Sequence, residues 1–297
     1  MKRKYIFSTG LIGILFMMLG QLSFSINDIL VKEIVVDSQS NMSVINVIFL
    51  RGLITSMIIL LYLKFYEKKN ILNIFKIKKY HQRGIYEVLT AIFFFTALIL
   101  LPVAEVYTLL MTNPFFVTIF AFLFLKEKVG IRRWTAVIIG FIGVIFVINP
   151  QNLDFNLLFI FPIIAAIFLT IRDIATKGIA TKTNSFEIIF ITSILMTLFS
   201  GIGSIFFEFT FKIEYLPNLF ISSMFLTVAY IFSVLTIFYA PLSLTASSRY
   251  SVIVFGIIFG YLILNEVPSL NMLIGATIIS LSGLFVIKRQ KELGKIK

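Results

Sequence analysis

The sequence predicts an all-α integral membrane protein with ten transmembrane helices, arranged as two inverted five-helix repeats. Three observations carry this prediction. The composition is too apolar for a water-soluble protein, ten apolar runs are each long enough to cross a bilayer, and basic residues collect in alternate loops. Matched positions of prolines, glutamates and glycines in the two halves predict that the halves are repeats of one another.

The composition sets the class of protein. Of the 297 residues, 59% are hydrophobic and 13% are charged, and the mean hydropathy is +1.01, whereas soluble domains carry about a quarter charged residues. Most of the surface is therefore expected to face lipid. The sequence contains no cysteine, so disulfides, thiolate metal sites and cysteine nucleophiles are excluded.

Apolar runs of about 20 residues, the length that crosses roughly 30 Å of hydrocarbon, define the spans. Their predicted ranges are 8–31, 44–63, 84–101, 104–125, 131–148, 155–176, 186–207, 217–238, 241–264 and 269–287. Pro102 and Pro241 separate two pairs of nearly continuous runs, because proline is tolerated at the start of a helix. The first run exceeds the roughly 7–15 apolar residues of a signal peptide, so we expect a span rather than a cleaved leader.

The basic residues predict the orientation. Of the Lys and Arg residues in the connecting segments or at the ends of the spans, only Lys32 and Lys212 lie on the side opposite the N-terminus. The others are Lys2, Arg3, Lys4, Lys64, Lys68, Lys69, Lys76, Lys78, Lys79, Arg83, Lys126, Lys128, Arg132, Arg133, Lys177, Lys182, Lys288, Arg289, Lys291, Lys295 and Lys297. The positive-inside rule therefore places both termini in the cytoplasm, which requires an even number of spans. The net charge of +12 is thus a topology signal and not a nucleic-acid-binding surface.

The two halves of the chain repeat one pattern. Pro102 precedes Glu127 by the same number of residues that separate Pro241 from Glu266. Each half contains five spans, an odd number, so the second half is expected to be inverted relative to the first. Inverted repeats of this kind form many secondary transporters, with the solute bound between them near the bilayer midplane.

This pattern resembles the paired EamA repeats of the drug/metabolite transporter superfamily. The residues that carry the resemblance are Ala97-Leu98, Pro102, Pro114, Leu125-Lys126-Glu127, Gly140 and Gly143, echoed by Tyr239-Ala240-Pro241, Asn265-Glu266, Gly275 and Gly283. The resemblance implies a first EamA repeat over residues 1–149, a second, inverted one over 150–297, and transport of a small organic metabolite. Asn27-Asp28 with Lys32, Arg51 and Arg249-Tyr250 are also similar to a proteobacterial subgroup that includes carriers for S-adenosylmethionine and for riboflavin.

Charged side chains inside the spans are the candidate functional residues, because each costs about 2.5–3.5 kcal/mol near the bilayer centre. They are Asp28, Arg51, Arg172, Asp173 and Arg249. Asp28 and Arg51 lie at similar depths in the outer half, so we expect them to pair. Asp173 and Arg249 are expected to form the equivalent pair in the inner half. Such pairs either form and break during alternating access or are permanent structural ion pairs.

Residues near the span ends and weaker polar features complete the candidates. Lys32, Lys64 and Lys177 are expected to reach the lipid headgroups, and Glu87 is expected at the cytoplasmic interface. Asn113-Pro114 interrupts the fourth span and either frees a carbonyl group to line a cavity or only kinks the helix. Polar tips and aromatic faces for a planar ligand come from Tyr107, Tyr230, Ser247, Ser248 and Tyr250.

The residue inventory argues against an enzyme. The single histidine, His81, lies in a basic loop, and no phosphate-binding glycine loop occurs. No cofactor or metal site is expected. A gated channel is the alternative from a different class, but channels usually carry a ring of polar or charged groups, whereas a few paired charges favour a carrier.

The charges inside the spans also limit the solute. Among these five charges the bases exceed the acids by one, and Glu105, at the expected outer mouth, is the only candidate to restore the balance. We therefore predict a riboflavin-like vitamin or an amino-acid-like solute. S-adenosylmethionine fits this tally less well, because its sulfonium would need a carboxylate or an aromatic cage, and it remains an alternative because of the family resemblance. The expected setting is the bacterial inner membrane, and the expected partners are the solute and the bilayer, without nucleic acid, for a monomer or homodimer.

Overall fold

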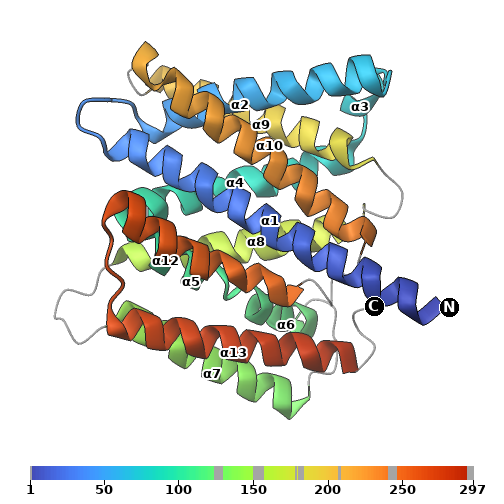
Figure 1. Cartoon of the computed structure of the whole chain (residues 1–297), viewed down its shortest axis with the longest axis vertical. Coiled ribbons are helices and arrows are strands. Elements are labelled where there is room, and N and C mark those ends of the chain that lie inside the picture. Colours follow the sequence, from blue (N-terminus) through green and yellow to red (C-terminus); the bar gives the residue numbers. More distant parts are fainter. Residues whose placement is uncertain are drawn as a thin grey trace.

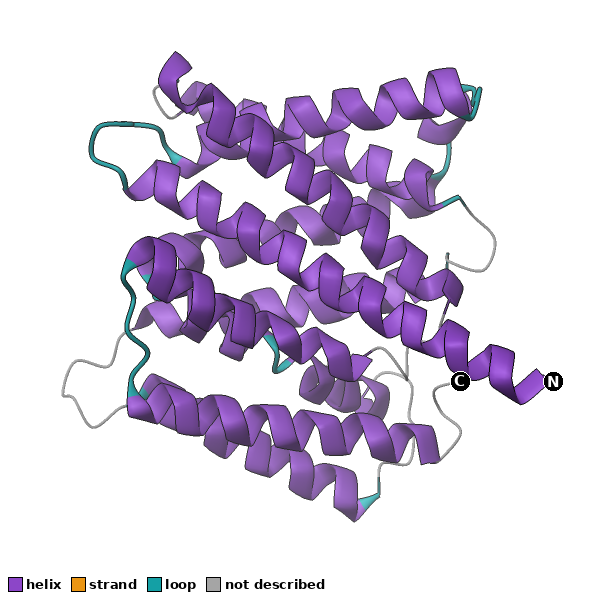
Figure 2. Cartoon of the chain, viewed as in Figure 1, coloured by secondary structure: helices purple, strands orange, loops and turns teal. Residues whose placement is uncertain are grey.

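The structure is a computed structural model that describes residues 2–123, 130–149, 157–177, 179, 184–206, 209–239 and 246–292. Within these residues the regular structure is entirely helical (Figure 2). The prediction of an all-α protein is therefore confirmed for the described part of the chain.

The helices follow the order of the predicted spans. Those before residue 150 are α1 (Lys2–Val36), α2 (Val44–Leu61), α3 (Ile71–Phe75), α4 (Lys78–Leu100), α5 (Val103–Leu110), α6 (Asn113–Leu123) and α7 (Ile131–Ile148). Those after it are α8 (Ile160–Lys177), α9 (Ser185–Phe206), α10 (Leu216–Tyr239), α12 (Ser251–Leu264) and α13 (Leu270–Glu292). A π-helical turn, η1 (Tyr62–Tyr66), extends α2, and 3₁₀ turns, η2 (Leu157–Phe159), η3 (Ile213–Tyr215) and η4 (Ala246–Tyr250), precede α8, α10 and α12.

Seven helical stretches of the described residues are long and apolar enough to cross a membrane. They are Leu11–Val36, Val44–Tyr66, Lys78–Leu100, Val103–Phe120, Leu157–Thr176, Phe186–Phe206 and Ile213–Ser233. Three shorter apolar helices occur at Trp134–Ile148, Ser248–Leu264 and Leu270–Phe285. Their number and hydropathy are those of a protein that crosses the bilayer several times.

The helices run across the long axis of the molecule and follow one another along it (Figure 1). α2, α9 and α10 pack together at one end, α7 and α13 form a pair at the other, and α1, α4 and α8 lie between them. The N-terminal end of α1 and the C-terminal end of α13 lie on the same side. An even number of crossings would produce this arrangement.

The predicted breaks at Pro102 and Pro114 have a clear local cause, whereas Pro241 lies outside the described residues. Pro102 caps α5, and the preceding residue, Leu101, is extended, because proline disfavours a helical conformation in the residue before it. Pro114 lies in the first turn of α6, where its missing N–H leaves no helical hydrogen bond unmade. The fourth predicted span is thus two short helices. At the gap between them, the carbonyl group of Met111 accepts the hydroxyl of Tyr250 at 3.4 Å.

Candidate functional site

A cavity of about 250 Å³ lies among helices from both halves of the chain. Its described walls come from α1, α2, α4 and α5 on one side of residue 150, and from α8, α9, α10, η4 and α12 on the other. Its charged lining residues are Asp28, Arg51, Arg83, Glu87, Arg172, Asp173 and Arg249. Of the predicted site residues, those that line it are Asp28, Arg51, Tyr107, Arg172, Asp173, Tyr230 and Arg249.

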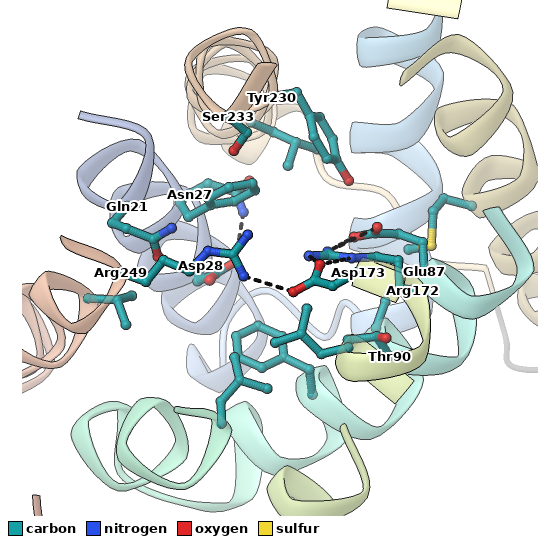
Figure 3. Close-up of a pocket in the computed structure, with 18 of the residues that line it drawn as sticks. Gln21, Asn27, Asp28, Glu87, Thr90, Arg172, Asp173, Tyr230, Ser233 and Arg249 are labelled. Atoms are coloured by element: carbon teal, nitrogen blue, oxygen red, sulfur yellow. Dashed lines mark hydrogen bonds and ion pairs between the residues drawn. The ribbon is translucent and has the colours of Figure 1, made fainter. Parts of the chain in front are cut away.

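Five of the charged residues form a continuous chain of ion pairs, which we call the Arg172 network: Arg83, Glu87, Arg172, Asp173 and Arg249. Arg172 Nη1 donates to both carboxylate oxygens of Glu87 at 3.1 Å, and its Nη2 donates to Asp173 Oδ1 at 2.7 Å. Asp173 Oδ2 accepts from Arg249 Nη1 at 2.8 Å, so its carboxylate lies between two guanidinium groups (Figure 3). The predicted pairing of Asp173 with Arg249 is therefore confirmed.

The part of this network on α4 differs from the sequence-based expectation. The placement of Glu87 at the interface was wrong, because its side chain is only 13% exposed and Arg83 Nη2 lies 2.8 Å from its carboxylate. Arg83, assigned to a loop, also donates to Thr192 of α9 at 2.6 Å. Both errors arise because α4 begins at Lys78, before the predicted start of the span, so that both residues lie well inside the helix. Arg83 and Glu87 are four residues apart, a spacing that places opposite charges on one helix face and could have indicated their ion pair.

A second charged group, which we call the Arg51 cluster, comprises Asn27, Asp28, Arg51 and Tyr107. Asp28 Oδ1 accepts from Asn27 Nδ2 at 2.8 Å, and Asp28 Oδ2 accepts from the Tyr107 hydroxyl at 2.9 Å. Arg51 Nη1 donates to Asn27 Oδ1 at 2.8 Å. Direct pairing of Asp28 with Arg51 was therefore wrong, because the amide of Asn27 stands between the two charges. The hydroxyl of Ser222, on α10, donates to the same amide oxygen at 2.9 Å and holds the amide in this orientation.

Arg51 is buried with most of its hydrogen-bonding capacity unused. The residue is 3% exposed, and its guanidinium group lies 4.9 Å from the centre of the Phe95 ring. Its Nε has no hydrogen-bond partner among the described residues. A guanidinium carries five N–H bonds, and the bond to Asn27 is the one hydrogen bond that its side chain donates within the described chain.

Close helix packing fixes two of the candidate tyrosines. A Cβ atom on Gly256 of α12 would lie 2.4 Å from Tyr107 Cδ2, so the glycine lets the Tyr107 ring lie against α12 while its hydroxyl reaches Asp28. In the same way, a Cβ atom on Gly283 would lie 1.5 Å from the Tyr250 hydroxyl. The Tyr250 side chain is buried in this packing and is not among the residues that line the cavity.

The other candidate residues have different positions. Asn113 begins α6 and is buried, but it is not among the described lining residues, so the break at Pro114 does not bring Asn113 to the cavity. The side chain of Ser247 lies outside the described residues. Tyr230 lines the cavity and meets Phe24 edge to face, with ring centres 5.7 Å apart. Glu105 likewise is not among the described residues of the wall.

The expectation that Lys32 reaches the headgroups was also wrong. Lys32 is 5% exposed, and its Nζ lies 2.5 Å from Glu266 Oε1 and donates to the carbonyl group of Leu101 at 2.6 Å. The other oxygen of Glu266 accepts the backbone N–H of Val103, the first residue of α5, at 2.7 Å. This cluster joins the end of α1, the connection between α4 and α5, and the segment between α12 and α13.

Comparisons with known proteins agree with transport across a membrane. Residues 11–149 match the EamA-like transporter family. Over 281 residues the chain is 27% identical to the S-adenosylmethionine uptake transporter of Rickettsia bellii, covering 95% of each protein. A stretch of 99 residues is 35% identical to the riboflavin transporter of Vibrio cholerae, covering 33% of each. One crystal structure shares the fold, with a TM-score of 0.60 and 15% identity over 95% of this chain and 98% of that chain. The family and the relatives point to a transporter and not to an enzyme.

Proposed function

Because residues 11–149 match the EamA-like transporter family, we propose that the whole chain is a secondary transporter. It moves a small organic metabolite across the bacterial inner membrane by alternating access. The observation that carries this proposal is the cavity, whose charged wall is built jointly by helices from before and after residue 150. A solute bound there contacts both halves, so relative movement of the halves can expose it first to one side and then to the other.

The packing of the helices supports ten spans in two inverted repeats, over residues 1–149 and 150–297. In such an arrangement α8 repeats α1, α9 repeats α2, α10 repeats α4 and α13 repeats α7. α1 packs against α10 and α8 packs against α4, which are the same contact under exchange of the halves. α2 packs against α9 and α7 against α13, so that each of these helices meets its own counterpart.

The proposed orientation has both termini in the cytoplasm. It rests on the basic residues in the loops, and the common side of the two described chain ends supports it. A reporter fused after residue 75 or after residue 297 is expected to read cytoplasmic, and one fused after residue 212 is expected to read external. A cytoplasmic reading after residue 212 would contradict the inverted second half.

The charge pattern favours a carrier over a channel. The charged side chains of the Arg172 network are matched to one another across the cavity wall, and do not form a ring around an open pore. The solute candidates are a riboflavin-like vitamin, S-adenosylmethionine and an amino acid. The similarity to the Rickettsia bellii protein extends over nearly the whole chain, and the similarity to the Vibrio cholerae protein over a third of it.

Transport by purified protein in liposomes tests this function. We expect saturable uptake of at least one labelled compound from a panel of riboflavin, S-adenosylmethionine and the common amino acids, with counterflow when unlabelled solute is trapped inside. Counterflow requires a binding site that alternates between the two sides, so it separates a carrier from a channel. Unsaturable flux with an ionic conductance would favour the channel, and no protein-dependent flux of any compound would contradict the proposal.

A further inference from the structure

Arg51 lines the cavity, and no carboxylate of the described chain accepts a hydrogen bond from its unused donors. Leaving a buried charged group without its hydrogen bonds costs about 1–3 kcal/mol or more. The neighbouring Arg172 does not have this deficit, because its Nε, Nη1 and Nη2 all donate to carboxylates. The carboxylate of a ligand could accept hydrogen bonds from the unused donors of Arg51 without competing with any carboxylate of the described chain.

Asp28 offers the complementary group beside it. A carboxylate has about four lone-pair positions, and the two hydrogen bonds from Asn27 and Tyr107 occupy only one on each oxygen. Both donors are neutral, so the negative charge of Asp28 has no cation in ion-pair contact within the described chain. Asn27 accepts from Arg51 and donates to Asp28, and thereby keeps the two opposite charges apart in one wall of the cavity.

We propose that the Arg51 cluster binds the α-amino-carboxylate end of the transported solute, with the carboxylate on Arg51 and the ammonium group on Asp28. This proposal rests on the proposed transport function and deepens it. The carboxylate and the ammonium of an amino-acid end lie on a single carbon, and the Asn27 amide, which accepts from Arg51 and donates to Asp28 through two atoms on a single carbon, already bridges the two side chains in a similar way. A zwitterion completes both groups without adding net charge to the cavity.

The rest of the cavity suits such a ligand. The rings of Phe94 and Tyr107 stack with centres 6.1 Å apart, and Phe94 also meets Phe95 at 5.1 Å, so an apolar wall adjoins the charged cluster. Water is limited beside this wall, and charge-assisted hydrogen bonds are correspondingly stronger. The cavity volume of about 250 Å³ lies below the roughly 300–1,000 Å³ typical of pockets for drug-sized ligands.

The proposed site also distinguishes the candidate solutes. Riboflavin has neither an ammonium nor a carboxylate group and would leave Arg51 and Asp28 without an oppositely charged partner. S-adenosylmethionine carries the required amino-carboxylate end.

Thermal stabilisation of the purified protein by matched compounds tests the proposal, because a ligand that binds the folded state raises the Tm. The panel contains S-adenosylmethionine, decarboxylated S-adenosylmethionine, methylthioadenosine, the common amino acids and riboflavin. We expect at least one compound with an intact amino-carboxylate end to stabilise the protein, and its counterpart without the carboxylate to bind about tenfold to hundredfold more weakly, the range for a charged hydrogen bond.

Variants identify Arg51 as the group responsible. Arg51→Gln is expected to remove the preference for the carboxylate, so that the intact and decarboxylated compounds bind equally. Arg51→Lys, which keeps the charge but not the planar pair of donors, is expected to retain part of the preference. Arg132→Gln removes a charge from the exposed start of α7 and serves as the control with unchanged preference. Size-exclusion profiles and melting without ligand verify that each variant is folded.

The outcomes separate this proposal from the transport function. Uptake of riboflavin alone, with no stabilisation by any amino-carboxylate compound, would overturn the Arg51 site and leave the transporter intact. Stabilisation that Arg51→Gln leaves unchanged would also overturn it. Loss of the carboxylate preference in Arg51→Gln, with retention in Arg132→Gln, would support it even in an assay that measures no transport.

Discussion

The Arg172 network and the Arg51 cluster are both charged and share one cavity, but they differ in how fully their hydrogen-bonding groups are used. In the network, each carboxylate contacts two guanidinium groups, and Arg172 donates four hydrogen bonds to two acids. In the cluster, an acid and a base are held apart by a neutral amide. Both acids of the network and Arg172 have their partners within the described chain, whereas Asp28 and Arg51 retain unused acceptor and donor positions.

This difference indicates that intramembrane charge alone does not identify a ligand site. A charged side chain in a span always needs a reason, but a saturated ion-pair chain can supply that reason structurally. Unused donors and acceptors on opposite charges are the more specific signal for binding. Substitutions in each region test this difference.

The largest expected effect is that of Glu87→Gln. This change leaves Arg83 and Arg172 without the carboxylate that both contact, and removing one partner of a buried ion pair costs about 3–5 kcal/mol. We expect a matching loss of unfolding free energy, measured by titration with sodium dodecyl sulfate in mixed micelles. Arg51→Gln is the comparison, because Arg51 makes no ion pair within the described chain, and its loss of stability is expected to be distinctly smaller. Equal losses would show that the two regions are energetically alike.

A second substitution measures how firmly the cluster itself is built. Tyr107→Phe removes a 2.9 Å hydrogen bond to the charged Asp28, and bonds of this kind contribute about 1.5–3 kcal/mol. Tyr250→Phe is the matched control, because Tyr250 is also buried but donates at 3.4 Å to a neutral carbonyl group. The loss of unfolding free energy in Tyr250→Phe is expected to stay below about 1 kcal/mol. A larger loss for Tyr250→Phe would contradict this ranking.

A double-mutant cycle tests whether the network acts as a unit. Asp173→Asn and Arg249→Gln each remove one side of a 2.8 Å ion pair. Residues in contact typically show a coupling free energy of about 0.5–3 kcal/mol, so the double variant is expected to be less destabilised than the sum of the single variants. Additive losses would show that the pair contributes nothing beyond its separate contacts.

The smallest effect is expected outside the cavity. The Tyr215 hydroxyl donates to Asp37 at 2.6 Å, and this bond holds the pKa of the Asp37 carboxyl below its usual 3.8. A depressed pKa stabilises the folded protein above the unfolded value, and this contribution disappears as the pH falls through the folded value. Tyr215→Phe is therefore expected to lower the Tm slightly at neutral pH, with a difference that shrinks on acidification below about pH 4. A difference that grows on acidification would contradict the assignment.

The sequence predicted the helices well, because long apolar runs and helix-starting prolines are local signals. It also found Asp173 and Arg249, since charges inside apolar runs stand out. It missed the roles of Glu87 and Lys32 because both lie close to predicted span ends, where a charged side chain usually reaches water or headgroups. Their partners come from distant segments, which no local pattern reveals. The position of Asn27 between Asp28 and Arg51 depends on the orientation of one amide, which only the packed structure defines.

The ion pair between Lys32 and Glu266 also constrains how the protein is made. The two residues are separated by 234 positions, so Lys32 enters the membrane with α1 long before its acid partner has been synthesised. Until the segment between α12 and α13 is made, the ammonium group at the end of α1 lacks its ion-pair partner. Chains that stop before Glu266 therefore lack the carboxylate that contacts Lys32, and we expect them to be degraded by quality-control proteases. The first half alone would be a poor substitute for the whole in any expression experiment.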